Sequence, residues 1–191
     1  METIASVYHV GKEEMLKEKG FILEAKKDMS KFSYLYEKYF ISIYRYVYNR
    51  IGDEASAADL TSQVFLKAMK SIKRYEFRGL PFSSWLYRIA SNELNLAFRE
   101  KKKAKRIYHM NTKDLPEMVD SPVDEETEEK VNLLLSALQG LDHDELELIQ
   151  MKYFEKRPYK EISEILEVEQ NALKVRVHRI KEKIRNIIST K

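Results

Sequence analysis

Four polar side chains in the middle of the chain have the types and the spacing expected of a nucleic-acid contact. They follow one another at steps of four, three and four residues, so they share one face of a helix. An asparagine amide pairs with a base edge, and an arginine guanidinium binds a phosphate or a guanine. The four residues are Arg88, Asn92, Asn95 and Arg99. We interpret this face as a candidate surface for reading nucleic acid.

Aromatic residues gather just before this face and at its start: Tyr75, Phe77, Phe82, Trp85 and Tyr87, with Arg78 among them. Aromatic rings beside basic residues stack on unpaired bases. Large rings also fill protein cores, and for Phe82 and Trp85 the core interpretation is favoured when each is taken alone. The tyrosines between Tyr34 and Tyr48 are interpreted as helix packing.

A second candidate surface lies near the C-terminus. Leu173, Val177, Ile180, Ile184 and Ile187 recur at helical steps and form one apolar face. The opposite side is cationic, with Lys174, His178, Lys181 and Arg185, and with Arg176 and Arg179 beside them. A major-groove helix needs this combination, although an ordinary surface helix also shows it. The short amphipathic helix before it, with Glu161, Ile162, Ile165 and Leu166, favours a helix-turn-helix.

Catalytic chemistry has no comparable signal in the sequence. The four histidines, His9, His109, His143 and His178, are isolated and have no partner at metal-ligand spacing. A glycine-rich phosphate loop is also lacking. Asp142, His143 and Asp144 are interpreted as a helix cap rather than a proton relay. We therefore expect neither an enzyme nor a bound metal or cofactor.

Composition points to a charged, helical protein. Of the 191 residues, 43% are hydrophobic and 34% are charged, and only five are glycine and four proline, which favours helices over turns and sheets. The lack of cysteine excludes a disulfide scaffold and fits a reducing cytoplasm, where we expect the protein to reside. No apolar run approaches the roughly 20 residues of a membrane span.

The net charge of +3 hides three blocks of opposite sign. Residues 98–106 carry six lysines or arginines and one glutamate, and residues 171–191 carry seven and one. Between them, residues 114–129 hold eight acidic residues and no lysine or arginine. Two separate basic blocks predict contact with nucleic acid at two places.

The apolar periodicity predicts an all-α fold in two small helical domains joined by an acidic flexible linker. A helix from Lys31 ends at Gly52, Asp53 caps the next, and a third begins near Ser83 or Ser84. Later helices are expected over residues 142–154, 159–166 and 170–188, and a short one over 13–27. The predicted domains are an N-terminal extension of unknown role (1–28), a first domain (29–105), the linker (106–130) and a helix-turn-helix domain (131–191).

Several motifs, taken together and in order, resemble extracytoplasmic-function sigma factors of the bacterial sigma-70 family. Residues 59–61 (Asp-Leu-Thr), 64–68, the loop 77–79 and 84–90 resemble region 2. Residues 153–155, 159–162, 164–166 and 174–179 resemble region 4. The likeness runs from about Phe32 to Ile188.

The resemblance implies a factor that binds core RNA polymerase and recognises and melts promoter DNA. Asp59, Gln63 and Lys67 are expected to bind core polymerase, at the clamp of its beta-prime subunit, with the beta flap as a further contact. The minus-ten element would be read and melted by Tyr75, Phe77, Arg78, Trp85, Arg88, Asn92, Asn95 and Arg99. The minus-thirty-five element would be bound by Asn171, Lys174, Arg176, His178 and Arg179. The acidic linker would follow the polymerase's RNA path, and an anti-sigma factor or a co-sigma partner protein is a further expected partner.

The chain departs from the family pattern at Ser62, Gln63, Leu96 and Glu167, the last at a turn position usually held by glycine, where a positive φ is often needed. Asn171 and Ala172 replace a frequent Gly-Thr. Two alternatives therefore remain: a sigma-like subunit that needs a partner protein, and a stand-alone helix-turn-helix regulator.

Overall fold

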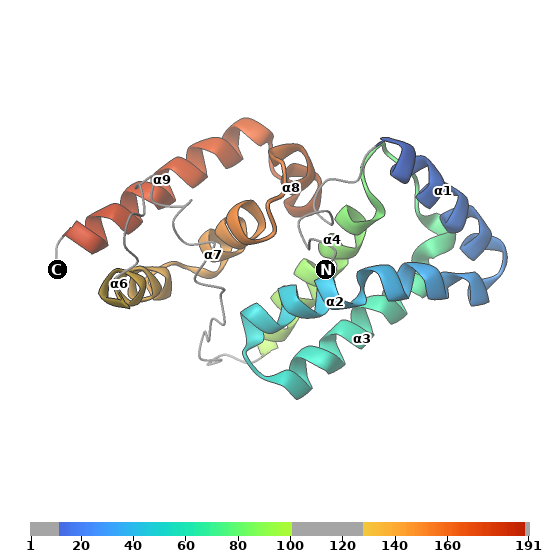
Figure 1. Cartoon of the computed structure of the whole chain (residues 1–191), viewed down its shortest axis with the longest axis horizontal. Coiled ribbons are helices and arrows are strands. Elements are labelled where there is room, and N and C mark those ends of the chain that lie inside the picture. The colour runs from blue at the N-terminus through green and yellow to red at the C-terminus, as the bar shows by residue number, and fades with distance from the viewer. Residues whose placement is uncertain (1–11, 101–127, 190–191) are drawn as a thin grey trace. The chain divides into compact units, whose positions relative to one another are not determined.

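The computed structural model of the chain describes residues 12–100 and 128–189, which form two separate units of packed helices (Figure 1). Helices α1 to α4 belong to the first unit and α6 to α9 to the second. Every regular element within these two ranges is helical. The predicted all-α fold in two helical domains is therefore confirmed. The predicted acidic linker lies outside the described residues except for its last three, which belong to α6.

The first unit is built from four α-helices and two single 3₁₀ turns. In chain order these are α1 (Lys12–Lys27), η2 (Met29–Phe32), α2 (Ser33–Ile51), α3 (Glu54–Ser71), η3 (Ile72–Arg74) and α4 (Phe82–Glu100). The predicted short helix over 13–27 is present as α1. Gly52 ends α2 in the left-handed conformation, with φ of 74°, and the Asp53 side chain caps α3 by accepting a hydrogen bond from the Ser56 amide. Helix α4 begins at Phe82, one or two residues before the predicted start, because the bond from the Ser84 amide to the Pro81 carbonyl already closes its first turn.

The core of the first unit lies where α2, α3 and α4 pack against one another. One face of α3 is buried there: Leu60, Val64, Phe65 and Ala68. At the centre, the ring of Phe32 meets those of Phe65 and Phe82 edge to face, each at 6.5 Å between centroids. Aromatic pairs prefer this arrangement because the positive edge of one ring faces the negative face of another.

The tyrosines of α2 fall into two groups. Tyr39 and Tyr46 are buried, as the packing interpretation predicts, whereas Tyr34 and Tyr36 stay 40% and 39% exposed. On the side of the helix that carries Tyr36, the rings of Phe40, Tyr44 and Tyr48 stack at four-residue steps. These rings therefore pack against one another between neighbouring turns of α2, outside the core.

The second unit contains α6 (Glu128–Gln139), α7 (His143–Ile149), a π-helical turn η5 (Gln150–Phe154), α8 (Tyr159–Leu166) and α9 (Gln170–Ser189). Gly140 directly follows α6. Asp142 caps α7 in a reciprocal capping box with Glu145, which confirms the interpretation of this acidic segment as a cap.

The prediction of one continuous α-helix over residues 142–154 is wrong in its last third. The amide of Glu155 bonds to the carbonyl of Gln150, five residues earlier, so the chain widens into a π-helical turn. The apolar residues keep a helical spacing through this segment, and this spacing does not distinguish a π turn from an α turn.

Glu167, between α8 and α9, has φ of 56° and ψ of 39°, the left-handed conformation expected at this position. Left-handed backbone costs a side-chain-bearing residue about 1–2 kcal/mol, and glycine avoids this cost.

We expect Glu167→Gly to raise the free energy of unfolding of the second unit by about 1 kcal/mol, measured by urea denaturation. Glu169→Gly is the matched control. Glu169 is also exposed and its replacement removes the same charge, but the φ of Glu169 is not positive. A loss of stability in Glu167→Gly equal to that in Glu169→Gly would contradict the prediction.

Within residues 12–100 and 128–189, no helix combines the length and the apolar character needed to cross a bilayer.

Candidate nucleic-acid interface

Helix α9 has one buried and one exposed side, as its sequence pattern predicts. Leu173, Val177, Ile180 and Ile184 are each at most 3% exposed and face the helices α6, α7 and α8. Helix α8 precedes it by the three-residue turn 167–169, so the two form a helix-turn-helix. The apolar side fixes α9 to its unit and leaves the other side free to meet a ligand.

All five residues predicted to bind the minus-thirty-five element lie on the exposed side of α9. They are Asn171, Lys174, Arg176, His178 and Arg179. The His178 Nε2 atom lies 3.4 Å from a Glu182 carboxylate oxygen, so this histidine has an acidic neighbour one turn away. Lys174, Arg176 and Arg179 supply permanent positive charge on the same surface. Such a surface attracts the phosphates of a DNA groove.

Ion pairs hold the second unit together around α9. A Lys183 ammonium donates to Glu145 of α7 at 2.6 Å, which joins α9 to α7. Arg157 donates to Glu161 at 2.6 Å, and both side chains are about 7% exposed. Because this second pair is buried at the start of α8, it restrains the geometry with which α8 and the turn present α9.

The aromatic loop before α4 is more deeply packed than a stacking platform requires. Tyr75 is 8% exposed, and its ring lies 5.2 Å from that of Phe82 and 4.9 Å from that of Trp85. Burial, with a smaller effect of the Glu18 charge, raises the pKa of Tyr75 to about 12, so its hydroxyl stays neutral near pH 7. Phe82 is fully buried, as the core interpretation predicts, and Tyr87 is buried too. Phe77 and Trp85 are half-buried and Arg78 is exposed.

The four polar residues of α4 remain accessible to different degrees. Asn92 and Arg99 are exposed, whereas Arg88 and Asn95 are half-buried and each takes part in a further interaction. Leu96 lies among them and is 46% exposed. The predicted face therefore exists on one helix, with the aromatic loop at the start of that helix.

The predicted polymerase-binding residues lie on the exposed side of α3. Asp59 and Gln63 are one turn apart and exposed. The Lys67 ammonium donates to the largely buried Glu93 carboxylate of α4 at 2.6 Å. Lys67 therefore connects α3 to α4 in addition to facing solvent.

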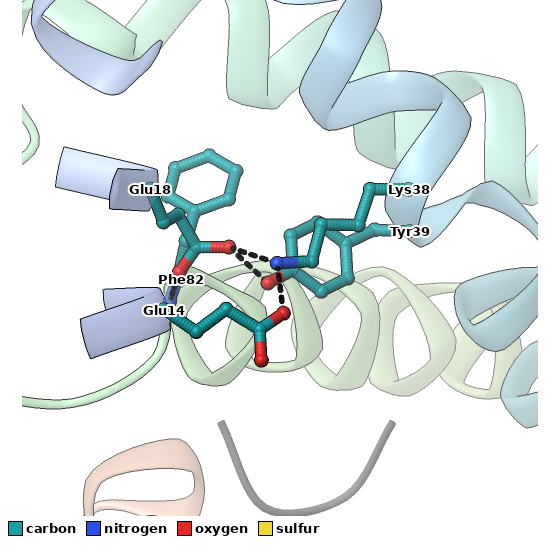
Figure 2. Close-up of polar contacts among 5 residues, drawn as sticks. All are labelled: Glu14, Glu18, Lys38, Tyr39 and Phe82. Carbon is teal, nitrogen blue, oxygen red and sulfur yellow. Dashed lines mark hydrogen bonds and ion pairs between the residues drawn. The ribbon is translucent and has the colours of Figure 1, made fainter. Parts of the chain in front are cut away.

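A buried carboxylate in α1 was missed by the sequence analysis. Glu18 is 2% exposed, and Figure 2 shows its oxygens facing α2 and the start of α4. One oxygen accepts hydrogen bonds from the Tyr39 hydroxyl and, at 3.3 Å, from the Lys38 ammonium. The other accepts from the Phe82 amide at 3.0 Å. The signal in the sequence was a charged residue at the helical position that precedes the buried Ile22 by one turn.

Lys38 completes this network. It also donates to Glu14 at 2.9 Å, as drawn in Figure 2. Burial alone would lower the pKa of Lys38, but the hydrogen bond to Glu14 and the charge of Glu18 outweigh it and the pKa is raised. Lys38 therefore stays charged and balances the buried carboxylate.

Comparison with known families decides what these two units are. Residues 35–104 match the model of Sigma-70 region 2, and residues 131–184 match the model of Sigma-70, region 4. The chain belongs to the sigma-70 family. The two matches fall on the two helical units in the order that the sequence motifs predict.

Named relatives place the chain in the extracytoplasmic-function (ECF) group of this family, which confirms the predicted resemblance. It is 30% identical over 149 residues to the ECF RNA polymerase sigma factor BldN of Streptomyces coelicolor, a match that covers 78% of this chain and 56% of BldN. It is 27% identical over 184 residues to the ECF RNA polymerase sigma factor SigW of Bacillus subtilis, covering 90% of this chain and 96% of SigW. The chain thus spans just over half of BldN and nearly all of SigW.

A solved structure supports the same fold. CnrH, determined in complex with the cytosolic domain of CnrY, aligns with a TM-score of 0.61 and 16% identity over 90% of this chain and 96% of CnrH.

Proposed function

We propose that this sigma-70 family protein binds core RNA polymerase, directs it to a specific set of promoters and helps to melt them. The observation that carries this proposal is the occurrence of regions 2 and 4 in one chain, together with an exposed cationic face on α9. A stand-alone helix-turn-helix regulator would use the second unit and would leave the polymerase-facing and loop residues of the first unit without a role.

The first unit would act on the minus-ten element. Trp85 and Phe77 are half-buried at the loop, so part of each ring is accessible to an unpaired base. Asn92 and Arg99 are exposed further along α4. Tyr75 is buried, so we assign it the role of supporting Trp85 from beneath rather than stacking on a base. Capture of unstacked bases offsets the few kcal/mol that unpairing costs per base.

The second unit would bind the minus-thirty-five element as duplex DNA. Lys174, Arg176, His178 and Arg179 occupy the exposed side of the helix that follows the turn, as the reading helix of a helix-turn-helix does. Asn171 lies one residue into that helix, where a reading helix approaches base edges.

Core polymerase would be bound mainly through α3. Asp59 and Gln63 form an exposed polar stripe that we assign to the beta-prime clamp. Contact of the second unit with the beta flap, and passage of the acidic segment along the RNA path of the polymerase, complete the proposed assembly.

Run-off transcription from fragmented host DNA, with core polymerase and with or without this protein, tests the proposal. New discrete transcripts that depend on the protein are the expected result, and their start sites give the promoter sequence. Stable polymerase binding without transcripts would favour a subunit that needs a partner protein. The absence of both polymerase binding and transcripts would contradict the proposal and would favour a stand-alone regulator.

Asn92→Ala is expected to impair strand opening more than initial duplex binding. Loss of one base-edge hydrogen bond of about 1–1.5 kcal/mol lowers open-complex formation by about five- to tenfold. Permanganate reactivity of unpaired thymines measures opening, and footprinting measures duplex binding. Asn171→Ala is the matched control, because the same substitution on α9 should weaken duplex binding instead. Equal permanganate reactivity in Asn92→Ala and wild type would refute the role of Asn92.

A second candidate function is regulation through a partner protein. CnrH is known in complex with the cytosolic domain of CnrY, and a protein of the same fold offers comparable surfaces to a regulator. We propose that an anti-sigma factor or a co-sigma protein binds this chain. Co-purification of the protein from its host under non-inducing conditions, followed by release of transcription activity when the bound protein is removed, is the test.

A further inference from the structure

Helix α1 reaches the aromatic loop, residues 75–81, at its start, its middle and its end. The Lys26 ammonium donates to the Tyr75 carbonyl at 2.5 Å. The Lys19 ammonium lies 5.6 Å from the centre of the Phe77 ring. The Glu18 carboxylate accepts from the Phe82 amide, the first residue after the loop. All three side chains come from residues 18–26, although the loop lies about fifty residues or more further along the chain.

The apolar side of α1 is buried and holds the helix in place beside the loop. Ile22 and Ala25 are 3% and 0% exposed, and α1 packs against η2, η3 and α2. The helix is therefore fixed in the first unit by its own packing. Its polar side chains then meet the loop from a rigid support.

The Phe82 amide is one of the N–H groups at the beginning of α4 that have no partner within the helix itself. Helix α4 has no acidic residue in its first turn, so its own sequence supplies no charge to balance the positive end of the helix dipole. Glu18 supplies both the acceptor and the negative charge from α1. The end of the loop is thus determined by a residue remote in sequence.

We propose that α1 is part of the minus-ten site, and that Glu18 and Lys26 are positioning residues that hold the loop in the shape that receives an unpaired base. The function of the loop assumed here is the one proposed above. Region 2, as matched, begins at residue 35, so α1 lies outside the matched segment and extends the site beyond it. Neither side chain needs to touch DNA: each acts on the backbone at one end of the loop.

Glu18→Gln tests one end of the loop. Three donors converge on the Glu18 carboxylate, and glutamine keeps the volume but replaces one accepting oxygen with an NH₂ group. At least one of the donors then loses its partner. Lys26→Met tests the other end by removing the donor to Tyr75 while keeping the aliphatic stem, and Lys26→Arg restores a donor. The matched controls are Glu24→Gln and Lys27→Met, because both residues are exposed on the same helix.

The first measurement uses the free full-length chain. Amide hydrogen exchange reports the loop and Phe82, with the amides of α3 as internal reference. The fluorescence quenching of Trp85, the single tryptophan, reports ring packing at the loop. We expect exchange of the Phe82 amide to rise about five- to tenfold in Glu18→Gln and that of the loop in Lys26→Met. Exchange in α3 should stay unchanged. Controls and Lys26→Arg should match wild type. Unchanged loop exchange in both test variants would overturn the proposal.

The second measurement uses the holoenzyme and an unpaired non-template strand that spans the minus-ten element mapped by run-off transcription. Affinity for this strand should fall at least about fivefold in Glu18→Gln and Lys26→Met, with core polymerase affinity unchanged. A loosened loop with unchanged strand affinity would overturn the proposal, because α1 would then serve folding alone. Failure of the wild-type holoenzyme to bind any such strand would refute the proposed function of the loop itself, whereas the exchange data would still report whether α1 holds it.

Discussion

Replacing Lys174 and Arg176 together by glutamate is expected to lower the affinity of the holoenzyme for minus-thirty-five duplex DNA by at least about a hundredfold. Each residue that contacts a phosphate or a base contributes about 1–3 kcal/mol, and reversal of its charge adds repulsion. Both side chains are exposed, on the two flanks of the solvent-facing side of α9, so the change leaves the buried side of the helix intact. The slope of log affinity against log salt concentration should also become less steep, by the amount that corresponds to about two lost phosphate contacts.

Fluorescence anisotropy with a labelled duplex, repeated over a salt series, measures both effects. The control is Lys27→Glu with Lys31→Glu, because these two lysines are exposed in the first unit and the double change removes the same charge. Core polymerase affinity should be the same in all variants. If the control lowers duplex affinity as much as the α9 variant, the loss reflects overall charge and α9 is not the reader.

Phe82→Ala should lower the free energy of unfolding of the first unit by about 3–5 kcal/mol. Phe82 is fully buried, and its ring contacts those of Phe32, Tyr39, Tyr75 and Trp85 at centroid distances between 5.2 and 6.5 Å. Alanine leaves a cavity among four rings that come from η2, α2, the aromatic loop and α4. The substitution keeps the Phe82 amide, so the hydrogen bond to Glu18 is not removed directly.

Urea denaturation followed by Trp85 fluorescence isolates the transition of the first unit, because the chain has a single tryptophan. The second unit is followed separately by circular dichroism, since two units need not unfold together. Leu66→Ala is the control: Leu66 is 50% exposed on α3, and its truncation should change stability by no more than about 0.5 kcal/mol. A loss below about 1 kcal/mol in Phe82→Ala would show that the core interpretation overstates the role of this ring.

The helices were predictable where a local pattern determines them. Asp53 and Asp142 cap helices with their own side chains, and Gly52 ends one by adopting positive φ. Glu167 was expected to need the left-handed conformation and has it. In each case the interaction joins residues close in the sequence, so residue type and spacing suffice.

Features that depend on distant partners were not predictable. Tyr75 is buried because α1 and α4 meet around the loop, and no pattern near residue 75 reveals this. Glu18 looks like one charge among many in a polar segment until α1 is packed and its carboxylate meets Lys38, Tyr39 and Phe82. The π turn at residues 150–154 is a local exception, because the apolar spacing does not encode the backbone bond from Glu155 to Gln150.

The ion pair between Lys67 and Glu93 joins the surface assigned to polymerase with the helix assigned to DNA. Glu93 directly follows Asn92 in the chain, so a polymerase contact that draws the Lys67 ammonium away would alter the charge next to a residue to which we assign DNA reading. Thermodynamic linkage makes such an effect reciprocal: whatever polymerase docking does to the affinity for the unpaired strand, the strand does to the affinity for polymerase. Under these assignments, a single lysine–glutamate contact would couple polymerase binding to promoter binding within the first unit.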